Sequence, residues 1–193
     1  MELNDKERMI LDAAAEVFAD KGFFKATVSE IANEAGVAKG TIYFYFESKR
    51  DLFKSLITSK TEALHQGIRK GQQKGESFEN QIKEIISSKL KFFAEEEGLA
   101  KSIIYDYAGM DEGFKLELWE LRNKHTEKIA EIFQKAIDDG VLRNISVDDT
   151  VTVLLGTVHA FGYKNYLSPV EEDVSIAETV DIIYDLFMQG VQK

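Results

Sequence analysis

Apolar residues return every three or four positions along most of the chain, which is the spacing of one face of a helix. The run that begins with Phe114, Leu118 and Leu121 shows this spacing clearly. A single proline leaves room for long uninterrupted helices. The predicted helices are 5–21, 28–35, 39–46, 49–70, 77–94, 99–108, 112–138, 151–162 and 176–191. The pattern therefore predicts an all-α protein.

Capping residues and one glycine mark two short helices and the start of a long one early in the chain. Thr27 and Glu30 form a capping box, in which a hydroxyl and a carboxylate satisfy each other's backbone N–H groups. Gly36 follows the first short helix, where a sharp turn requires a left-handed residue. Ser48 and Asp51 repeat the capping signature before the long helix. This order predicts a helix-turn-helix, whose second helix enters the major groove of DNA.

The second short helix, 39–46, carries more aromatic rings than its interior can hold. Ile42 and Phe46 lie four residues apart and can supply its buried side. Its other side chains suit contacts with DNA: Lys39, Thr41, Tyr43, Phe44 and Tyr45. The alternative is an ordinary helical hairpin without a role in DNA binding.

These residues carry a resemblance to a known family. The run is Thr27-Val28-x-x-Ile31-Ala32-x-x-Ala35-Gly36-Val37-x-Lys39-Gly40-Thr41-Ile42-Tyr43-x-Tyr45-Phe46-x-Ser48-Lys49-x-x-Leu52. In this order and without a gap, it resembles the DNA-binding domain of the TetR family of bacterial transcriptional regulators. The segment 13–22 is similar to the first helix of that domain. The resemblance covers about the first quarter of the chain, and the remainder agrees with the family in length and helical character.

The resemblance implies a helix-turn-helix DNA-binding domain over residues 1–48 and a larger helical domain over 49–193 for effector binding and dimerisation. It implies DNA contacts by Thr27, Val28, Lys39, Gly40, Thr41, Tyr43, Phe44, Tyr45 and Lys49. Thr27 and Lys49 stand at predicted helix N-termini, where phosphates bind. Ala38 departs from the family, which often has serine there, so one helix cap and one phosphate contact are missing.

The net charge of −10 is unusual for a protein that binds DNA. An acidic body weakens non-specific adhesion to DNA, so binding has to rely on specific contacts. The absence of cysteine excludes disulfides, thiolate chemistry and zinc fingers. No apolar signal core appears, and no apolar run is long enough to cross a membrane. We therefore expect a soluble, cytoplasmic protein without a membrane partner.

Catalytic and metal-binding patterns give little support for an enzyme. Gly-rich phosphate loops, HExxH and EF-hand patterns are absent, and residues 75–79 lack the closing glycine of a nucleophile elbow. His65, His125 and His159 stand far apart, so surface or core positions explain them better than metal binding. His159 lies on the most apolar predicted helix and needs a polar partner, which a ligand could supply. We expect no enzymatic activity, no metal and no cofactor.

Aromatic residues in the C-terminal part exceed what a small helical body needs for packing, which favours a mostly apolar cavity. In the TetR family such a cavity commonly binds a small molecule. The residues expected to line it are Leu64, Leu90, Phe93, Ile103, Tyr107, Phe114, Leu118, Trp119, His159 and Tyr163. For each of them, an ordinary place in a packed core is the alternative. Fatty acyl chains and flat drugs suit such a cavity equally.

Segment 151–162 is apolar almost throughout, so it is either buried all round within one chain or covered by a second subunit. We expect it to pair with 176–191 and their copies in a four-helix homodimer interface, as the resemblance also implies. A core helix in a monomer is the alternative.

Together with the resemblance, the sequence predicts a ligand-responsive transcriptional regulator, a repressor that binds a palindromic double-stranded operator as a dimer. A small, largely apolar effector would release it from DNA. A helical protein that sequesters a small molecule and a small all-α enzyme, both without specific DNA binding, remain as alternatives. The sequence does not specify the effector, the operator or the regulated genes.

Overall fold

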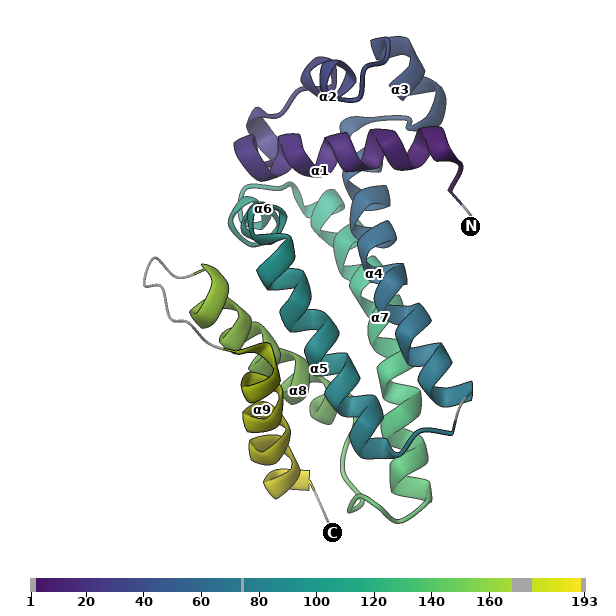
Figure 1. The fold of residues 1–193 in the computed structure, drawn as a ribbon, viewed down its shortest axis with the longest axis vertical. Coiled ribbons are helices and arrows are strands. Elements are labelled where there is room, and N and C mark those ends of the chain that lie inside the picture. Colours follow the sequence, from purple (N-terminus) through teal and green to yellow (C-terminus); the bar gives the residue numbers. More distant parts are fainter. Residues whose placement is uncertain (1–2, 74, 168–174, 192–193) are drawn as a thin grey trace. The chain divides into compact units, whose positions relative to one another are not determined.

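The computed structural model describes residues 3–73, 75–167 and 175–191, apart from the side chains of residues 63–73 and His125. The described residues form helices and no strands (Figure 1). The helices are α1 (Asp5–Lys25), α2 (Val28–Glu34), α3 (Lys39–Tyr45), α4 (Lys49–Gln73), α5 (Phe78–Glu95), α6 (Glu97–Tyr107), α7 (Glu112–Asp138), α8 (Val147–Gly162), the π-helix η1 (Tyr163–Leu167) and α9 (Ile176–Val191). The all-α prediction is confirmed, and α7 and α9 have the predicted bounds.

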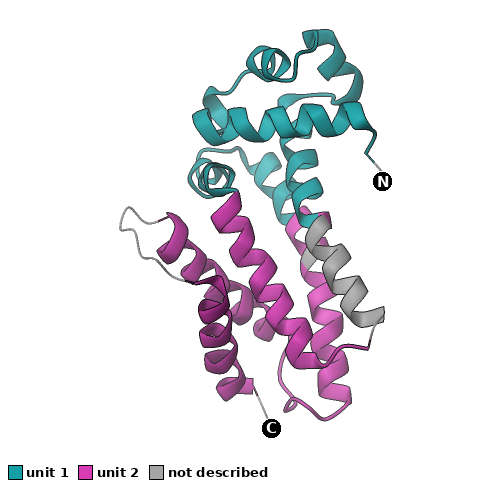
Figure 2. Ribbon diagram, viewed as in Figure 1, with its two compact units in different colours: residues 1–61, 96–119 teal, residues 62–95, 120–193 magenta. Residues whose placement is uncertain are grey.

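The chain forms two compact units, which Figure 2 shows in different colours. Unit 1 consists of residues 1–61 and 96–119, and unit 2 of residues 62–95 and 120–193. Unit 1 thus joins the helix-turn-helix to α6 and the start of α7. The predicted boundary after residue 48 follows the sequence motif, whereas these units follow the packing of the helices.

The predicted capping residues set the helix starts in unit 1. The Thr27 hydroxyl accepts a hydrogen bond from the Glu30 N–H at 3.2 Å, and the Glu30 carboxylate accepts one from the Thr27 N–H at 2.9 Å. Gly36 turns the chain with a φ of 61°. Ser48 Oγ caps the Asp51 N–H at 3.1 Å, although the carboxylate of Asp51 accepts from the residue before Ser48. The predicted helix-turn-helix is therefore present.

Aromatic rings form the core of unit 1. Phe53 lies 5.0 Å from both Phe18 and Phe23, measured between ring centroids, and Phe114 lies 5.2 Å from Phe23. All four rings are buried. Phe24, by contrast, is half-exposed, because the chain leaves the α1 helix at Gly22, which has a φ of 74°.

Unit 2 is built around α5, which packs against α8 and α9. Its core also takes apolar side chains from the second half of α7, including Ile129 and Phe133. Gly162 at the end of α8 allows a close approach, since a Cβ there would lie 2.4 Å from the Phe93 ring. The ring of Phe93, which belongs to α5, can therefore pack against α8 only because residue 162 is a glycine.

The alternative that segment 151–162 is a core helix buried all round within one chain does not hold, and the predicted pairing with a second subunit stays a prediction. Val153 on α8 has 58% of its surface exposed, and Ile182 and Leu186 on α9 are also exposed. The other face of α8 is buried and includes Leu154 and Val158. Both helices thus carry an apolar face that packs against nothing within the described residues of this unit.

Among the described helices, none combines the length and the apolar character of a membrane span.

Candidate DNA-binding and effector sites

Helix α3 presents its aromatic side chains to solvent. Ile42 is buried and holds the helix to unit 1, whereas Phe44 is 81% exposed and Tyr43 is 48% exposed. The Phe44 and Tyr45 rings meet edge to face at 5.0 Å, and Lys39 Nζ lies 6.0 Å from the centroid of the Tyr43 ring. An exposed face with this many rings and a basic group can contact base edges and phosphates.

The other predicted contacts on this face differ in accessibility. Gly40 is exposed with no atom within 4 Å of the position of a Cβ, and Thr41 is partly buried. Ala38 makes no side-chain cap at the start of α3, as its missing hydroxyl predicts. The Val28 side chain is buried, because it lies on the core face of α2. Of Val28, only the backbone is therefore available at the start of α2.

The N-terminus of α2 already holds an acidic group. The Glu30 carboxylate accepts a hydrogen bond from the Thr27 hydroxyl at 2.7 Å and pairs with Lys21 at 2.7 Å. The hydrogen bond from Lys21 is the main cause that lowers the pKa of Glu30 to about 2, and Thr27 adds to it. This carboxylate stays ionised at neutral pH, so any phosphate contact of Thr27 is made beside a negative charge.

Lys49 makes contacts that the sequence did not predict. Its ammonium donates hydrogen bonds to the backbone carbonyls of Phe23 at 2.7 Å, Phe24 at 3.2 Å and Ala26 at 2.9 Å. It also lies 4.7 Å from the centroid of the Phe23 ring. Burial lowers its pKa, and the charge of Asp106 opposes this shift. The Lys49 side chain therefore fastens α4 to the end of α1, and its predicted contact with a phosphate stays a prediction.

Helix α6 holds the same end of α1 from another side. The Phe23 N–H donates to Asp106 Oδ2 at 2.6 Å and to Ser102 Oγ at 3.1 Å. The φ of 74° at Gly22 turns this N–H away from the helical hydrogen-bond pattern and toward α6. Ser102 of α6 and Lys49 of α4 both form hydrogen bonds with the backbone at the end of α1. The end of α1 therefore connects α4 and α6 within unit 1.

Ion pairs fix the start of α7 to α4. Arg50 pairs with Asp111 and lies 5.1 Å from the centroid of the Phe114 ring, and Lys54 pairs with Glu117 at 2.7 Å. A structural role for Phe114 is thus accounted for by the packing of unit 1. Its predicted contact with an effector stays a prediction.

The residues predicted to bind the effector fall in both units. Unit 1 contains Ile103, Tyr107, Phe114, Leu118 and Trp119, and unit 2 contains Leu90, Phe93, His159 and Tyr163. The side chain of Leu64 lies outside what the structure describes. The clearest contact between these residues is in unit 2, where the rings of Phe93 and His159 meet at 5.8 Å. Leu90 is fully buried in the core of that unit, whereas Tyr107, Trp119 and Tyr163 are exposed.

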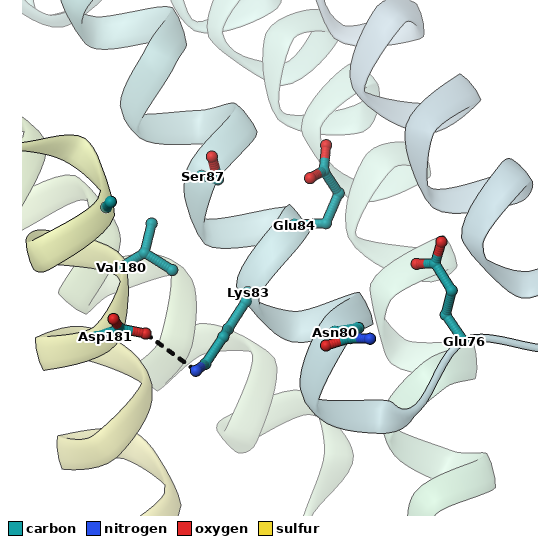
Figure 3. A pocket seen from close by; sticks show the side chains of 8 residues that line it. Glu76, Asn80, Lys83, Glu84, Ser87, Val180 and Asp181 are labelled. Carbon is teal, nitrogen blue, oxygen red and sulfur yellow. Dashed lines mark ion pairs between the residues drawn. The ribbon is translucent and has the colours of Figure 1, made fainter.

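A surface hollow in unit 2 lies between α5 and α9 (Figure 3). It contains none of the predicted effector residues; its lining is mostly polar, and Lys83 reaches across it. Lys83 Nζ pairs with Asp181 and Glu79, each at 3.0 Å, and these hydrogen bonds raise its pKa. The positive charge in this hollow is therefore already balanced.

A second lysine of α5 has the opposite environment. Burial and, to a smaller extent, the charge of Arg122 on α7 together lower the pKa of Lys89 to about 8. Burial also lowers the pKa of His159 to about 4, with smaller contributions from Lys89 and Arg122. His159 keeps part of its surface exposed, but its ring lies against Phe93. Of these three groups, sequence reasoning singled out only His159, since the others look like ordinary surface cations.

Comparison with known proteins finds a family match in the N-terminal part of the chain. Residues 10–56 match the sequence model described as "Bacterial regulatory proteins, tetR family". The fatty acid metabolism regulator protein of Bacillus subtilis (strain 168) is 35% identical over 95 residues. That match spans 49% of this chain and 49% of the relative, so the chain aligns with about half the length of that protein.

Solved structures extend the likeness to nearly the whole chain. The fatty acid degradation regulator FadR from Bacillus halodurans is 25% identical, with a TM-score of 0.85 over 95% of this chain and 98% of that chain. The transcriptional regulator FadR from Bacillus subtilis, solved in complex with stearoyl-CoA, is 24% identical, with a TM-score of 0.81 over 95% and 98%. The C-terminal helices therefore share the fold of these regulators.

Proposed function

Because this chain belongs to the TetR family of bacterial transcriptional regulators, we propose that it represses transcription by binding a palindromic operator as a homodimer and leaves DNA when an amphipathic effector binds. The observation that carries the proposal is the exposed aromatic face of α3, with Phe44 81% exposed beside Tyr43. A buried face would be expected if these rings only filled a core.

The proposed dimer uses the exposed apolar faces of α8 and α9. Val153, Ile182 and Leu186 would become buried against their copies in a symmetric four-helix interface. Two recognition helices must then stand about 34–36 Å apart to enter successive turns of the major groove. A dimer of this kind reads a palindrome, because its symmetry repeats the same contacts on both half-sites.

DNA contacts are proposed for the exposed side chains of Lys39, Tyr43 and Phe44 on α3, for the partly buried ones of Thr41 and Tyr45, and for the open backbone at Gly40. Thr27 and Val28 are proposed to contribute the N-terminal end of α2. Lys49 is proposed to hold α1 in position, because three carbonyls already surround its ammonium.

The proposed effector is a long-chain acyl compound. Two observations on relatives support this class: a Bacillus subtilis relative is a fatty acid metabolism regulator, and a protein of the same fold was solved with stearoyl-CoA. An effector that prefers a state with a different spacing of the recognition helices shifts the population away from DNA, and a coupling of about 1–3 kcal/mol changes the affinity about 5–150-fold.

Selection from a random double-stranded DNA library tests the proposal. The purified full chain is expected to enrich a palindromic sequence whose half-sites lie one or two helical turns apart. Phe44→Ala is expected to lose that preference, whereas Lys91→Ala, an exposed substitution on α5, should keep it. Enrichment of no common sequence by the wild-type protein would contradict the proposal.

A further inference from the structure

Many of the cationic side chains near the helix-turn-helix already have partners within the protein. Four of the lysine and arginine residues in the range 1–61 are Lys6, Arg8, Lys25 and Lys39. All others in this range meet carboxylate or carbonyl oxygens of unit 1: Lys21, Lys49, Arg50, Lys54 and Lys60. More than half of the cations in the DNA-binding part are thus bound internally.

Two of these ion pairs lie at the start of the helix that follows α3. Arg50 donates from Nη1 to Asp111 Oδ1 at 3.4 Å and from Nη2 to Asp111 Oδ2. Lys54 Nζ pairs with Glu117 Oε2 at 2.7 Å. Arg50 and Lys54 are four residues apart, so they lie on one face of α4. Both acids belong to the start of α7, and all four residues lie in unit 1 (Figure 2).

Asp111 is held in place by a second contact. Its Oδ1 accepts a hydrogen bond from the Phe114 N–H at 3.1 Å, which caps the start of α7. This hydrogen bond is the main cause that lowers the pKa of Asp111, and the charge of Arg50 adds to the shift. The carboxylate therefore stays ionised at neutral pH and faces Arg50 from a fixed position.

The stability of the fold does not explain the two pairs. Their side chains keep between 32% and 53% of their surface exposed, and exposed ion pairs contribute little to stability. Their position gives a better reason. Each residue of α4 rises about 1.5 Å, so Lys54 lies only about 8 Å along the helix from Lys49. This is about one screening length at physiological salt, so unpaired charges here would attract the phosphates of DNA bound at α3.

We propose that Asp111 and Glu117 are intramolecular counterions that withhold Arg50 and Lys54 from the phosphates of DNA. They limit the sequence-independent, salt-dependent part of the DNA affinity, so that operator binding relies on the contacts of α3. This inference rests on the proposed function and concerns the regulation of the same DNA-binding surface. A protein that adheres weakly to random DNA stays available for its operator, although a genome offers many competing sites.

Salt titration of DNA binding tests the proposal on the full chain. Fluorescence anisotropy measures the affinity for the selected operator and for a random-sequence duplex of the same length, at about 50 to 200 mM KCl. Asp111→Asn can still cap α7, and Glu117→Gln changes a partly exposed side chain, so a folding defect in one leaves the other as a test.

Each variant frees one cation per subunit and two per proposed dimer. The slope of the logarithm of affinity against the logarithm of salt concentration should therefore steepen by up to about 1.8. Across this salt range, the affinity should then fall about tenfold more than that of the wild-type protein. At the low-salt end, both variants should bind the random-sequence duplex several times more tightly than wild type does.

Glu131→Gln is the matched control. It removes the same charge from α7, where Glu131 pairs with Lys128 at 3.0 Å in unit 2. Its slope should stay close to that of wild type. Equal slopes for wild type, Asp111→Asn and Glu117→Gln would overturn the proposal, and so would an equal change in Glu131→Gln.

A double-mutant cycle assigns the effect to Lys54. In the wild-type background Lys54→Met removes a charge that Glu117 already balances, so the slope should not change. In the Glu117→Gln background the same substitution should restore the wild-type slope. If Lys54→Met reduced the slope equally in both backgrounds, Lys54 would contact a phosphate in spite of Glu117, and the counterion role would be refuted.

The two duplexes separate the failure of this inference from that of the proposed function. If the wild-type protein selects an operator and the slopes do not differ, only the counterion role is wrong. If it selects no operator while the variants still bind the random-sequence duplex with a steeper slope, only the proposed function is wrong. If no variant binds either duplex at low salt, both are refuted.

Discussion

In unit 1 the ammonium of Lys49 lies against three backbone carbonyls, whereas in unit 2 no described carboxylate or carbonyl pairs with the ammonium of Lys89. Burial lowers the pKa of both lysines. Only Lys49, however, has oxygen atoms that compensate for the lost water. A lysine whose ammonium has a full set of protein acceptors belongs to the fold, whereas one without them has to keep contact with water.

The same contrast applies to the surroundings of each lysine. In unit 1, Arg50 and Lys54 pair with acids at the start of α7. In unit 2, Lys83 is paired in the hollow of Figure 3, while Lys89, further along α5, has no acid partner among the described residues. Lysines of the same chain thus have a carboxylate partner at some positions and none at others. Substituting lysine by methionine at chosen positions separates these roles.

The largest effect is expected for Lys49→Met. Loss of the ammonium leaves three carbonyls without their donor, and we expect the free energy of unfolding to fall by about 3 kcal/mol. Urea denaturation measures the change, with Lys91→Met as a control that stays within about 0.5 kcal/mol of wild type. If Lys49→Met were stable and instead reduced the salt dependence of operator binding, the ammonium would contact a phosphate after all.

Gly22→Ala should weaken the connection between α1 and α6. The φ of 74° and ψ of 168° at Gly22 are unfavourable for alanine, and a Cβ there would lie 2.9 Å from Asp106 Oδ2. We expect a loss of about 2 kcal/mol in thermal or urea unfolding.

Gly36→Ala provides the matched control for this prediction. Gly36 also has a positive φ, 61°, but nothing lies within 4 Å of the added Cβ. The loss there should be about 1 kcal/mol, from backbone strain alone. Equal losses at the two glycines would show that the contact with Asp106 adds nothing.

Lys89→Met is expected to act in the opposite direction to Lys49→Met. Removing a partly buried charge that has no counter-charge should raise the free energy of unfolding of the ligand-free protein by about 1 kcal/mol. The measurement is the same urea titration, performed on delipidated protein. A clear loss of stability would mean that Lys89 has a structural partner in the fold.

The smallest effect concerns pH and His159. Its pKa is about 4 in the folded protein, below the ordinary value of 6.5, so on acidification the unfolded chain takes up the proton first. The contribution of this group to stability is complete above pH 6.5 and is lost as the pH falls toward 4. His159→Gln should therefore flatten the fall in melting temperature over this range.

The sequence by itself determined the helices and the DNA-binding motif. The effects of Thr27, Glu30 and Gly36 are local, because each acts on residues within about one helical turn. Their roles can therefore be predicted from the sequence without knowledge of the tertiary structure. Periodicity likewise placed α7 and α9 at their observed bounds. The pattern also predicted that rings of α3 face solvent, because Ile42 and Phe46 are enough to fill the buried side of this segment.

Only the tertiary structure decided what the charged side chains do. The position of Lys49 at a predicted helix N-terminus suggested a contact with phosphate, but the bend at Gly22 brings the carbonyl groups of Phe23, Phe24 and Ala26 to its ammonium. Lys89, Arg122 and His159 lie on three helices, and helical periodicity gives each helix a buried face without saying which neighbours meet there. Electrostatic partners far apart in the chain are set by helix packing, so a sequence pattern cannot reveal them.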